Sequence, residues 1–185
     1  MKATGIVRRI DDLGRVVIPK EIRRTMRIRE GDPLEIYTDR EGEVIFKKYS
    51  PIGELAAFAA QYAETLHKTC SLSVIISDRD AVIACAGVPK KEYTDKTLSK
   101  ELEEIIEGRS LYVHKDGSEP IAVLSEGGNH YVKCAMPIIS EGDIAGCVAA
   151  VSELPFEVRR EQPSNEVEAK LILTAAGFLG RQLES

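Results

Sequence analysis

Two patterns of apolar positions divide the chain near residue 50. In the first part short apolar runs alternate with turn residues, so that GIVRRI and RVVI are predicted strands joined by DDLG, and PLEIYTD and EVIFKK a hairpin closed by Arg40, Glu41 and Gly42. Pro19 suits the start of a helix, PKEIRRTMR, that ends before residues 30–33. About fifty residues bury too little surface to be stable alone, so this module is expected to dimerise.

The second part of the chain predicts longer elements. Ser50 and Pro51 have the residue types of a helix N-cap and first position, and a helix is expected to about Thr69. Two strands, a helix at 98–107, four strands and a final helix from Ser164 to Leu183 follow; the strands are LSVIIS, AVIACAG, SLYVH, IAVLS, HYVKCAMPIIS and IAGCVAAVS. Tight turns between successive strands predict a mainly antiparallel sheet with the long helices on one face. The predicted fold class is α+β.

An apolar stripe on the first long helix allows two interpretations. Its members follow a 3-4-3-4 spacing, the pattern of a helix that packs along another helix: Ile52, Leu55, Ala59, Tyr62 and Leu66. The stripe covers only about two heptads, so packing on the domain's own sheet is equally compatible with it. If the stripe packs against another subunit, the final helix supplies candidate partners: Leu171, Ala175, Phe178 and Leu179.

Charge is distributed unevenly along the chain. The formal net charge is -5, but residues 1–29 contain nine Lys or Arg and three acidic residues, a charge of +6, which leaves -11 for the remainder. A local positive field attracts phosphate whatever the total charge, so the asymmetry predicts two modules with different partners. An ordinary solvated charged surface is the alternative.

The basic residues of the first module are arranged on a helix and on strands. Spacings of three or four place Lys20, Arg23, Arg24 and Arg27 on one helix face, with Ile22 and Met26 on a core face. Arginines on strands and helix together offer bidentate donors to phosphates and guanine edges. No aromatic stripe lies between the cations, which favours duplex over single-stranded DNA. A solvated arginine-rich helix is the alternative.

The sequence gives little support for a membrane protein, a secreted protein, a metal-binding protein or an enzyme. No apolar run is long enough for a membrane span, and MKATGIVRRI lacks the apolar core of a secretory signal, so we expect a cytoplasmic protein without a membrane partner. The four cysteines lack metal-ligand spacing and are predicted to be reduced core residues. The scattered histidines form no catalytic set, so no catalytic residue, metal site or cofactor is predicted, and the expectation is that the protein is not an enzyme.

The run TGIVRRIDDLGRVVIPKEIRRTMRIREGDPLEIYTDREGEVIFKKYSP resembles the AbrB-like transition-state regulator family. This resemblance implies a swapped-hairpin β-barrel dimer over residues 1–50 that binds double-stranded DNA. The resemblance implies that Arg8, Arg15, Arg23 and Arg24 contact DNA, because they occupy the positions of the DNA-contacting arginines in the family motif. Arg9 occupies a basic position of the same motif.

The remainder, ending NEVEAKLILTAAGFLGRQLES, is similar to sporulation regulators in which a GAF-type domain follows the DNA-binding dimer. This similarity implies a linking and oligomerisation helix at 51–70 and a GAF-like sensor or assembly domain at 71–185. It also implies a tetramer built as a dimer of dimers that activates some forespore genes and represses others. The motif of cyclic-nucleotide-binding GAF domains is absent, so no cyclic nucleotide is expected, and the existence of another small-molecule effector stays open.

Two further function classes are kept as alternatives. Some GAF-type domains reduce methionine sulfoxide with pocket cysteines, and this chain contains Cys85, Cys134 and Cys147. A catalytic cysteine needs exposure and a lowered pKa, whereas these lie in apolar runs. Related swapped-hairpin domains act as antitoxins through a flexible tail, but here a strongly patterned domain takes the place of the tail.

Overall fold

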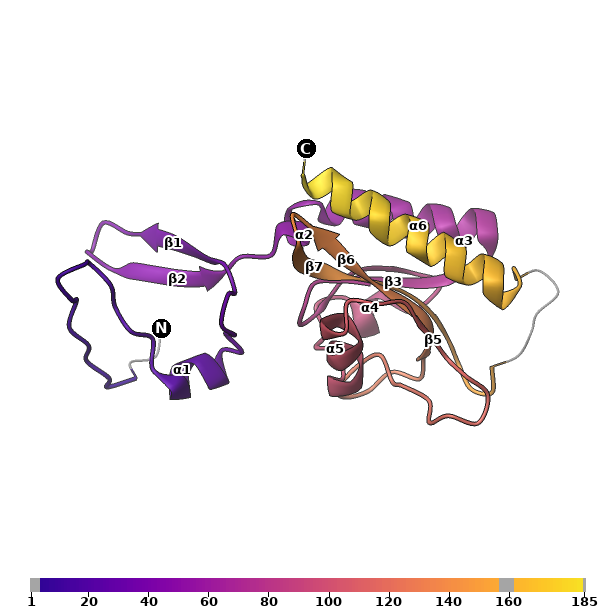
Figure 1. Ribbon diagram of the computed structural model, residues 1–185, viewed down its shortest axis with the longest axis horizontal. Coiled ribbons are helices and arrows are strands. Elements are labelled where there is room, and N and C mark those ends of the chain that lie inside the picture. The colour runs from indigo at the N-terminus through magenta and orange to yellow at the C-terminus, as the bar shows by residue number, and fades with distance from the viewer. Residues whose placement is uncertain (1–3, 157–161, 185) are drawn as a thin grey trace. The chain divides into compact units, whose positions relative to one another are not determined.

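The computed structural model describes residues 4–156 and 162–184. The chain forms two compact units, Met1–Tyr49 and Ser50–Ser185 (Figure 1). Among the described residues, no helix combines the length and the apolar character needed to cross a bilayer.

The first unit contains one short helix and one hairpin. Helix α1 (Lys20–Thr25) follows Pro19, and strands β1 (Leu34–Thr38) and β2 (Val44–Lys48) pair antiparallel. The side chain of Asp39 closes the hairpin by accepting the N–H groups of Glu41 and Glu43, each at 2.9 Å. Gly42 has a φ of +86°, a conformation that glycine adopts without steric cost. The predicted helix and hairpin are therefore present.

The two other strands expected in this unit, at 5–10 and 15–18, are not formed. The turn between them is present, because Asp11 N–H donates to the Arg15 carbonyl at 3.0 Å, but neither flank is a strand. A strand exists only where a neighbour completes its hydrogen bonds. The prediction of these two strands is therefore wrong for the single chain, in which the described residues offer them no sheet partner.

The second unit is a five-stranded antiparallel sheet with helices on both faces. Its strands are β3 (Ser73–Ser77), β4 (Val82–Ala86), β5 (Tyr112–Val113), β6 (Tyr131–Ser140) and β7 (Asp143–Ser152), in the order β4-β3-β7-β6-β5. Its helices are α2 (Pro51–Glu54), α3 (Ala56–Cys70), α4 (Lys90–Tyr93), α5 (Lys100–Glu107) and α6 (Asn165–Leu183). The long helices α3 and α6 lie on one face and α5 on the other (Figure 1). The predicted α+β class, with an antiparallel sheet domain and flanking helices, is confirmed.

Alternation along the strands separates two apolar cores. On β3, Val74 and Ile76 pack with α3 and α6, whereas Ile75 packs with Leu102 and Ile106 of α5. Successive strand residues point to opposite faces, so a sheet covered on both sides needs apolar residues at nearly every position. This requirement explains the continuous apolar runs of β3, β4 and β7.

Some elements differ from those predicted. The helix expected from Ser50 to Thr69 is interrupted at Leu55, where α2 ends and α3 begins. The expected strand IAVLS forms only isolated bridges, Leu98 with Leu124 and Ala122 with Tyr131. The short helix α4 was not expected.

The apolar stripe on α2 and α3 packs on its own sheet. Ile52, Ala59 and Leu66 are buried in the core beneath α3, and Leu55 and Tyr62 are partly buried beside it. Of the candidate partners on α6, Ala175 and Leu179 are buried in the same core, Leu171 packs against it, and Phe178 is exposed. The interpretation that the stripe packs on the domain's own sheet is therefore the correct one.

Two glycines of α6 provide a matched pair for a stability test. A Cβ on Gly180 would overlap the Ile139 carbonyl of β6, whereas a Cβ on Gly177 would meet no atom. We expect Gly180→Ala to destabilise the second unit by roughly 1–3 kcal/mol, as overpacking does. Gly177→Ala should be neutral or stabilise by about 0.5–1 kcal/mol, because alanine favours the helix. Urea unfolding would measure both, and equal midpoints would contradict this close approach of α6 to β6.

Candidate nucleic-acid interface

The five arginines predicted to contact DNA are all exposed on the first unit: Arg8, Arg9, Arg15, Arg23 and Arg24. Arg23 and Arg24 are neighbours in the last turn of α1, and Arg15 follows the turn that begins at Asp11. The contacts of Arg8 and Arg15 are local, because Arg8 Nη1 donates to the Val7 carbonyl at 3.3 Å and Arg15 bonds to Asp11.

The basic face predicted for α1 is shorter than expected. The helix ends at Thr25, and Arg27 lies beyond it with a φ of +53°, so the expected placement of Arg27 on the helix face is wrong. The Arg27 carbonyl accepts a hydrogen bond from Lys48 Nζ at 2.8 Å, which joins the end of the helix region to the hairpin. Met26, expected in a core, is 57% exposed, because this unit contains little core of its own.

The turn before Arg15 is held by one carboxylate. Asp11 Oδ1 accepts the backbone N–H of Leu13 at 3.0 Å and of Arg15 at 2.8 Å, and Asp11 Oδ2 accepts Arg15 Nε at 2.8 Å. These bonds, the backbone bond from Arg15 first, hold the pKa of Asp11 below its usual value. Gly14 completes the turn with a φ of +78°.

The sequence pattern predicts Arg15 as a site residue but does not predict its partner Asp11. By the pattern alone, Asp11 is one of the acidic residues and part of a turn. The signal for more was present, since Asp side chains often bond backbone N–H groups two or more residues ahead, and Gly14 marks the left-handed position before Arg15.

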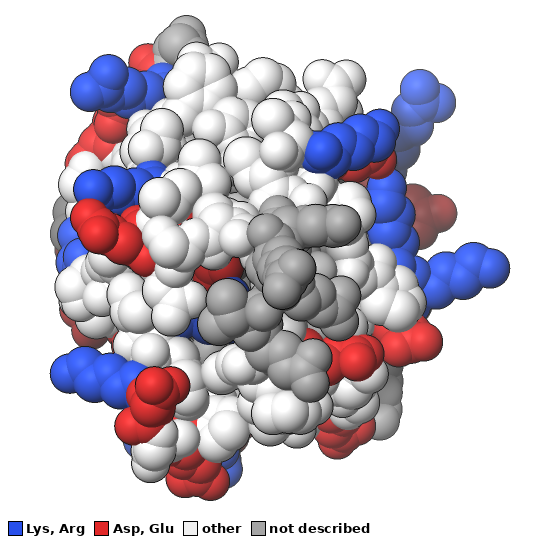
Figure 2. All heavy atoms as spheres, turned by 90° about the vertical axis from the view of Figure 1, so that its right-hand side faces the viewer, with Lys and Arg blue, Asp and Glu red and all other residues white. Residues whose placement is uncertain are grey.

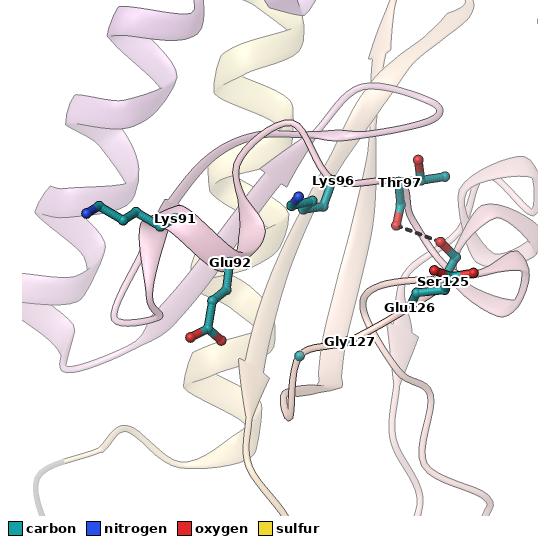
Figure 3. A pocket seen from close by; sticks show the side chains of 8 residues that line it. Lys91, Glu92, Lys96, Thr97, Ser125, Glu126 and Gly127 are labelled. Atoms are coloured by element: carbon teal, nitrogen blue, oxygen red, sulfur yellow. Dashed lines mark hydrogen bonds between the residues drawn. The ribbon is translucent and has the colours of Figure 1, made fainter.

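The second unit has an open cavity of about 460 Å³ beside α4. Lys91 and Glu92 of α4, Lys96 and Thr97, and the loop from Ser125 to Gly128 surround it (Figure 3). The buried Tyr93 hydroxyl holds that loop, because it accepts the N–H groups of Asn129 and His130 at 3.1 Å and lies 2.9 Å from His130 Nδ1. Burial raises the pKa of Tyr93 and lowers that of His130.

A second cavity, of about 390 Å³, lies where β5, β6 and the start of α6 meet. It contains a buried ion pair, because Lys133 Nζ lies 2.7 Å from Glu168 Oε2 and the Glu168 side chain is 3% exposed. A buried carboxylate needs such a partner. On the face shown in Figure 2, outside the grey residues, acidic and basic side chains are interspersed among uncharged ones. The part of this face that the structure describes therefore has no continuous basic patch.

Comparisons with known proteins decide the family. The family model "Stage V sporulation protein T C-terminal, transcription factor" matches residues 54–184, and the model "Antidote-toxin recognition MazE, bacterial antitoxin" matches residues 7–53. Stage V sporulation protein T of Bacillus subtilis is 53% identical over 186 aligned residues, which cover 100% of this chain and 99% of that protein. The chain belongs to the stage V sporulation protein T family.

Solved structures that are similar to parts of this family member cover each of its two units. The N-terminal DNA recognition domain of the Bacillus subtilis transition-state regulator AbrB is 65% identical, covering 26% of this chain and 91% of that one, with a TM-score of 0.23. A GAF domain/HD domain protein from Geobacter sulfurreducens is 17% identical, covering 75% of this chain and 99% of that one, with a TM-score of 0.43. The two family models and the identity to stage V sporulation protein T, and not these structural likenesses, confirm the predicted AbrB-like resemblance, and this member of the stage V sporulation protein T family is a DNA-binding transcription regulator.

The cysteines of this family member do not have the character of redox nucleophiles. Cys85, Cys134 and Cys147 are buried, and burial raises the pKa of all three, that of Cys134 to about 12. A thiol with such a pKa is a thiolate in only about one molecule in 10⁴ at pH 8. The residues that the structure describes also contain no group of three or more His, Cys, Asp or Glu that could hold a metal ion.

We expect a thiol reagent to separate the four cysteines into two classes. In the native protein only the half-buried Cys70 should react readily, and the other three should react fast only in denaturant. In the native Cys70→Ser variant, all of the remaining cysteines should therefore react slowly with the reagent. Rapid native labelling of Cys134, together with turnover of free methionine sulfoxide, would instead support the reductase alternative.

Proposed function

We propose that this chain regulates sporulation genes in the cytoplasm of the forespore, activating some and repressing others, as a homo-oligomer bound to duplex DNA. The observation that carries the proposal is 53% identity to stage V sporulation protein T along the whole chain. Because the identity extends over both units, it supports a shared role and not only a shared DNA-binding part.

The first unit acts as a dimer. Apart from Pro19, no apolar residue among residues 4–49 is buried, and Val7, Ile10 and Leu13 are 84%, 71% and 71% exposed. Contiguous exposed apolar surface marks an interaction site. A second copy of the unit would cover these side chains and supply the strand partners that residues 5–10 and 15–18 lack, as expected for a swapped-hairpin barrel.

In this dimer DNA is bound by the arginines predicted from the sequence. Arg15, Arg23 and Arg24 are the principal contacts, and Arg8 and Arg9 add charge beside them. All five guanidinium-bearing residues are exposed and lie in the segment of +6 charge. Exposed guanidinium groups release counterions from phosphate and can also read guanine edges.

The second unit joins two such dimers into a tetramer. Three aromatic side chains meet across α3 and α6: the Phe178 ring lies 5.9 Å from Phe58 and 5.6 Å from Tyr62, measured between ring centroids. Phe178 remains 40% exposed. Partly exposed aromatic clusters are typical of subunit contacts. These three residues, here called the aromatic patch, are therefore assigned to contact a second copy.

We further propose that the second unit responds to a small polar molecule. The two cavities support this role, because both are lined by charged side chains at the ends of secondary-structure elements. The raised thiol pKa values argue against a reductase that uses these cysteines as nucleophiles. A toxin-binding tail is disfavoured because the described residues of the segment 54–184, which would hold it, form a packed domain.

The proposal can be tested in the native host during sporulation. Crosslinking, precipitation and sequencing of bound DNA, with transcript counts from a deletion strain, should find promoters whose transcripts rise and others whose transcripts fall. The Arg23→Ala/Arg24→Ala variant should lose these sites at equal protein abundance. Absence of promoter enrichment for the parent protein would contradict the proposed regulator.

A further inference from the structure

The contact between Asp11 and Arg15 involves one particular side of the guanidinium group. Asp11 Oδ2 accepts the Nε hydrogen of Arg15, while Asp11 Oδ1 is used by backbone N–H groups of the same turn. A guanidinium offers five N–H donors in a planar fork. A carboxylate on Nε leaves the end formed by Nη1 and Nη2 pointing away from it. The Arg15 side chain is 70% exposed, so this end is accessible to a partner.

We propose that Asp11 is a positioning residue that holds Arg15 for end-on, bidentate recognition of guanine, through the N7 and O6 acceptors on its major-groove edge. The inference rests on the proposed DNA-binding function and adds a specificity role to one residue of it. Arginine that bonds guanine in this way makes the most frequent specific base contact in the major groove.

Charge distinguishes a base edge from a phosphate as the partner. An aspartate carboxylate is ionised at neutral pH, and the bonds within the turn lower the pKa of Asp11 further. A negative charge beside the arginine repels phosphate and weakens backbone contacts, which carry most of the sequence-independent affinity. The same carboxylate repels an uncharged guanine edge much less than a phosphate, and it restricts the Arg15 side chain to one orientation. Asp11 should therefore raise specificity and slightly lower affinity for unrelated DNA.

Stability alone does not explain the pair. The Asp11 side chain is 37% exposed, and exposed ion pairs contribute little to folding. The backbone bonds of Asp11 Oδ1 do support the turn, so a test must keep them. Asn at position 11 preserves an oxygen that accepts from Leu13 and Arg15 but replaces the acceptor of Nε with an amide.

The experiment compares Asp11→Asn with Asp12→Asn in the full chain. Asp12 is the adjacent exposed acid of the same turn, so its variant makes the same change in charge without removing the acceptor of Arg15 Nε. The probes are a duplex selected by the parent protein from a randomised library and a scrambled duplex of equal composition. Circular dichroism and light scattering check that each variant keeps its fold and mass.

We expect Asp11→Asn to weaken binding to the selected duplex about tenfold, the lower part of the range for a bidentate base contact. Binding to the scrambled duplex should stay equal or become tighter, so the specificity ratio falls. Asp12→Asn should keep the ratio. In an Arg15→Ala background, Asp11→Asn should change the ratio no further, because the group it positions is absent.

Three outcomes would overturn the inference. If the two Asn variants have equal specificity ratios while Arg15→Ala loses specific binding, the Asp11 role falls and the DNA-binding function stands. If Asp11→Asn lowers the ratio equally in the presence and absence of Arg15, Asp11 acts through the turn and not through Arg15. If Arg15→Ala binds both duplexes like the parent, the proposed arginine surface fails and this inference fails with it.

Discussion

Replacing Arg23 and Arg24 together by Ala is expected to weaken binding to a selected duplex by roughly 100-fold or more, since each bidentate arginine contact contributes about 1–3 kcal/mol. Both residues are exposed in the last turn of α1, so the substitutions leave the core intact and the fold should persist. The slope of log K against log salt should also become shallower by roughly 1 for each arginine that no longer binds a phosphate. Fluorescence anisotropy at a series of NaCl concentrations would measure both quantities.

A matched control removes two cationic groups from the hairpin of the same unit. Arg40 lies in the turn between β1 and β2, and Lys47 on β2 lies over the Tyr37 ring at 4.5 Å. Arg40→Ala/Lys47→Ala should reduce overall affinity modestly while preserving preference for the selected duplex. Equal reductions in affinity for the two double variants would show that total charge, and not the α1 pair, governs binding.

The second large effect is expected at the aromatic patch. Phe178→Glu places a charge beside Phe58 and Tyr62 and should halve the mass measured by light scattering, from tetramer to dimer. Linked dimers bind two-site DNA with an avidity that can exceed single-site binding by roughly 100-fold or more, and this gain should disappear. Binding of the variant to single-site DNA should change little, because the first unit is untouched.

Leu173→Glu is the control for this charge. Leu173 lies on the same helix with similar exposure, 44% against 40% for Phe178, and does not belong to the aromatic patch. This variant should remain tetrameric. A tetrameric Phe178→Glu protein would show that the aromatic patch does not join the dimers. Charges at Leu55 and Leu66 would not serve as a test, because Leu66 is buried in the core of its own unit and Leu55 packs against it.

The elements predicted correctly from the sequence are those with strong local signals. Helix α6 begins where Ser164 accepts the Val167 N–H as an N-cap, and β6 and β7 are long apolar runs joined by a glycine turn. In these segments local preference and tertiary packing agree, so the sequence pattern was sufficient to place them.

The failures have a common physical cause, since each depends on groups far away in the sequence or on another chain. Residues 5–10 and 15–18 have strand composition, but composition cannot supply a hydrogen-bonding neighbour. IAVLS is apolar because Val123 and Leu124 fill the core beneath the sheet, and not because it extends the sheet. The stripe on α3 could not reveal which surface covers it, because a helix packed on its own sheet and one packed on a partner helix have the same periodicity.

The sequence predicts which residue types form the DNA-binding site, but it predicts the geometry of their side chains only in part. The basic character of Arg15, Arg23 and Arg24 follows directly from the sequence. The bond from Arg15 Nε to Asp11 depends on the side-chain conformations of both residues, which no spacing rule determines. Helix α1 ends at Thr25 through local backbone bonds around the left-handed Arg27, in which the Ile28 N–H donates to the Arg23 carbonyl at 2.8 Å. The bond from Lys48 to the Arg27 carbonyl joins groups 21 residues apart in sequence, and no local pattern indicates it.

The most direct test of DNA recognition by this chain is selection of duplexes from a randomised library by the purified full-length protein, followed by titration of the enriched and scrambled sequences. We expect an enriched motif bound roughly 10³-fold or more tightly than its scrambled counterpart, with affinity that falls steeply as salt rises. Equal affinity for the two duplexes at every salt concentration would contradict sequence-specific binding and, with it, the central claim.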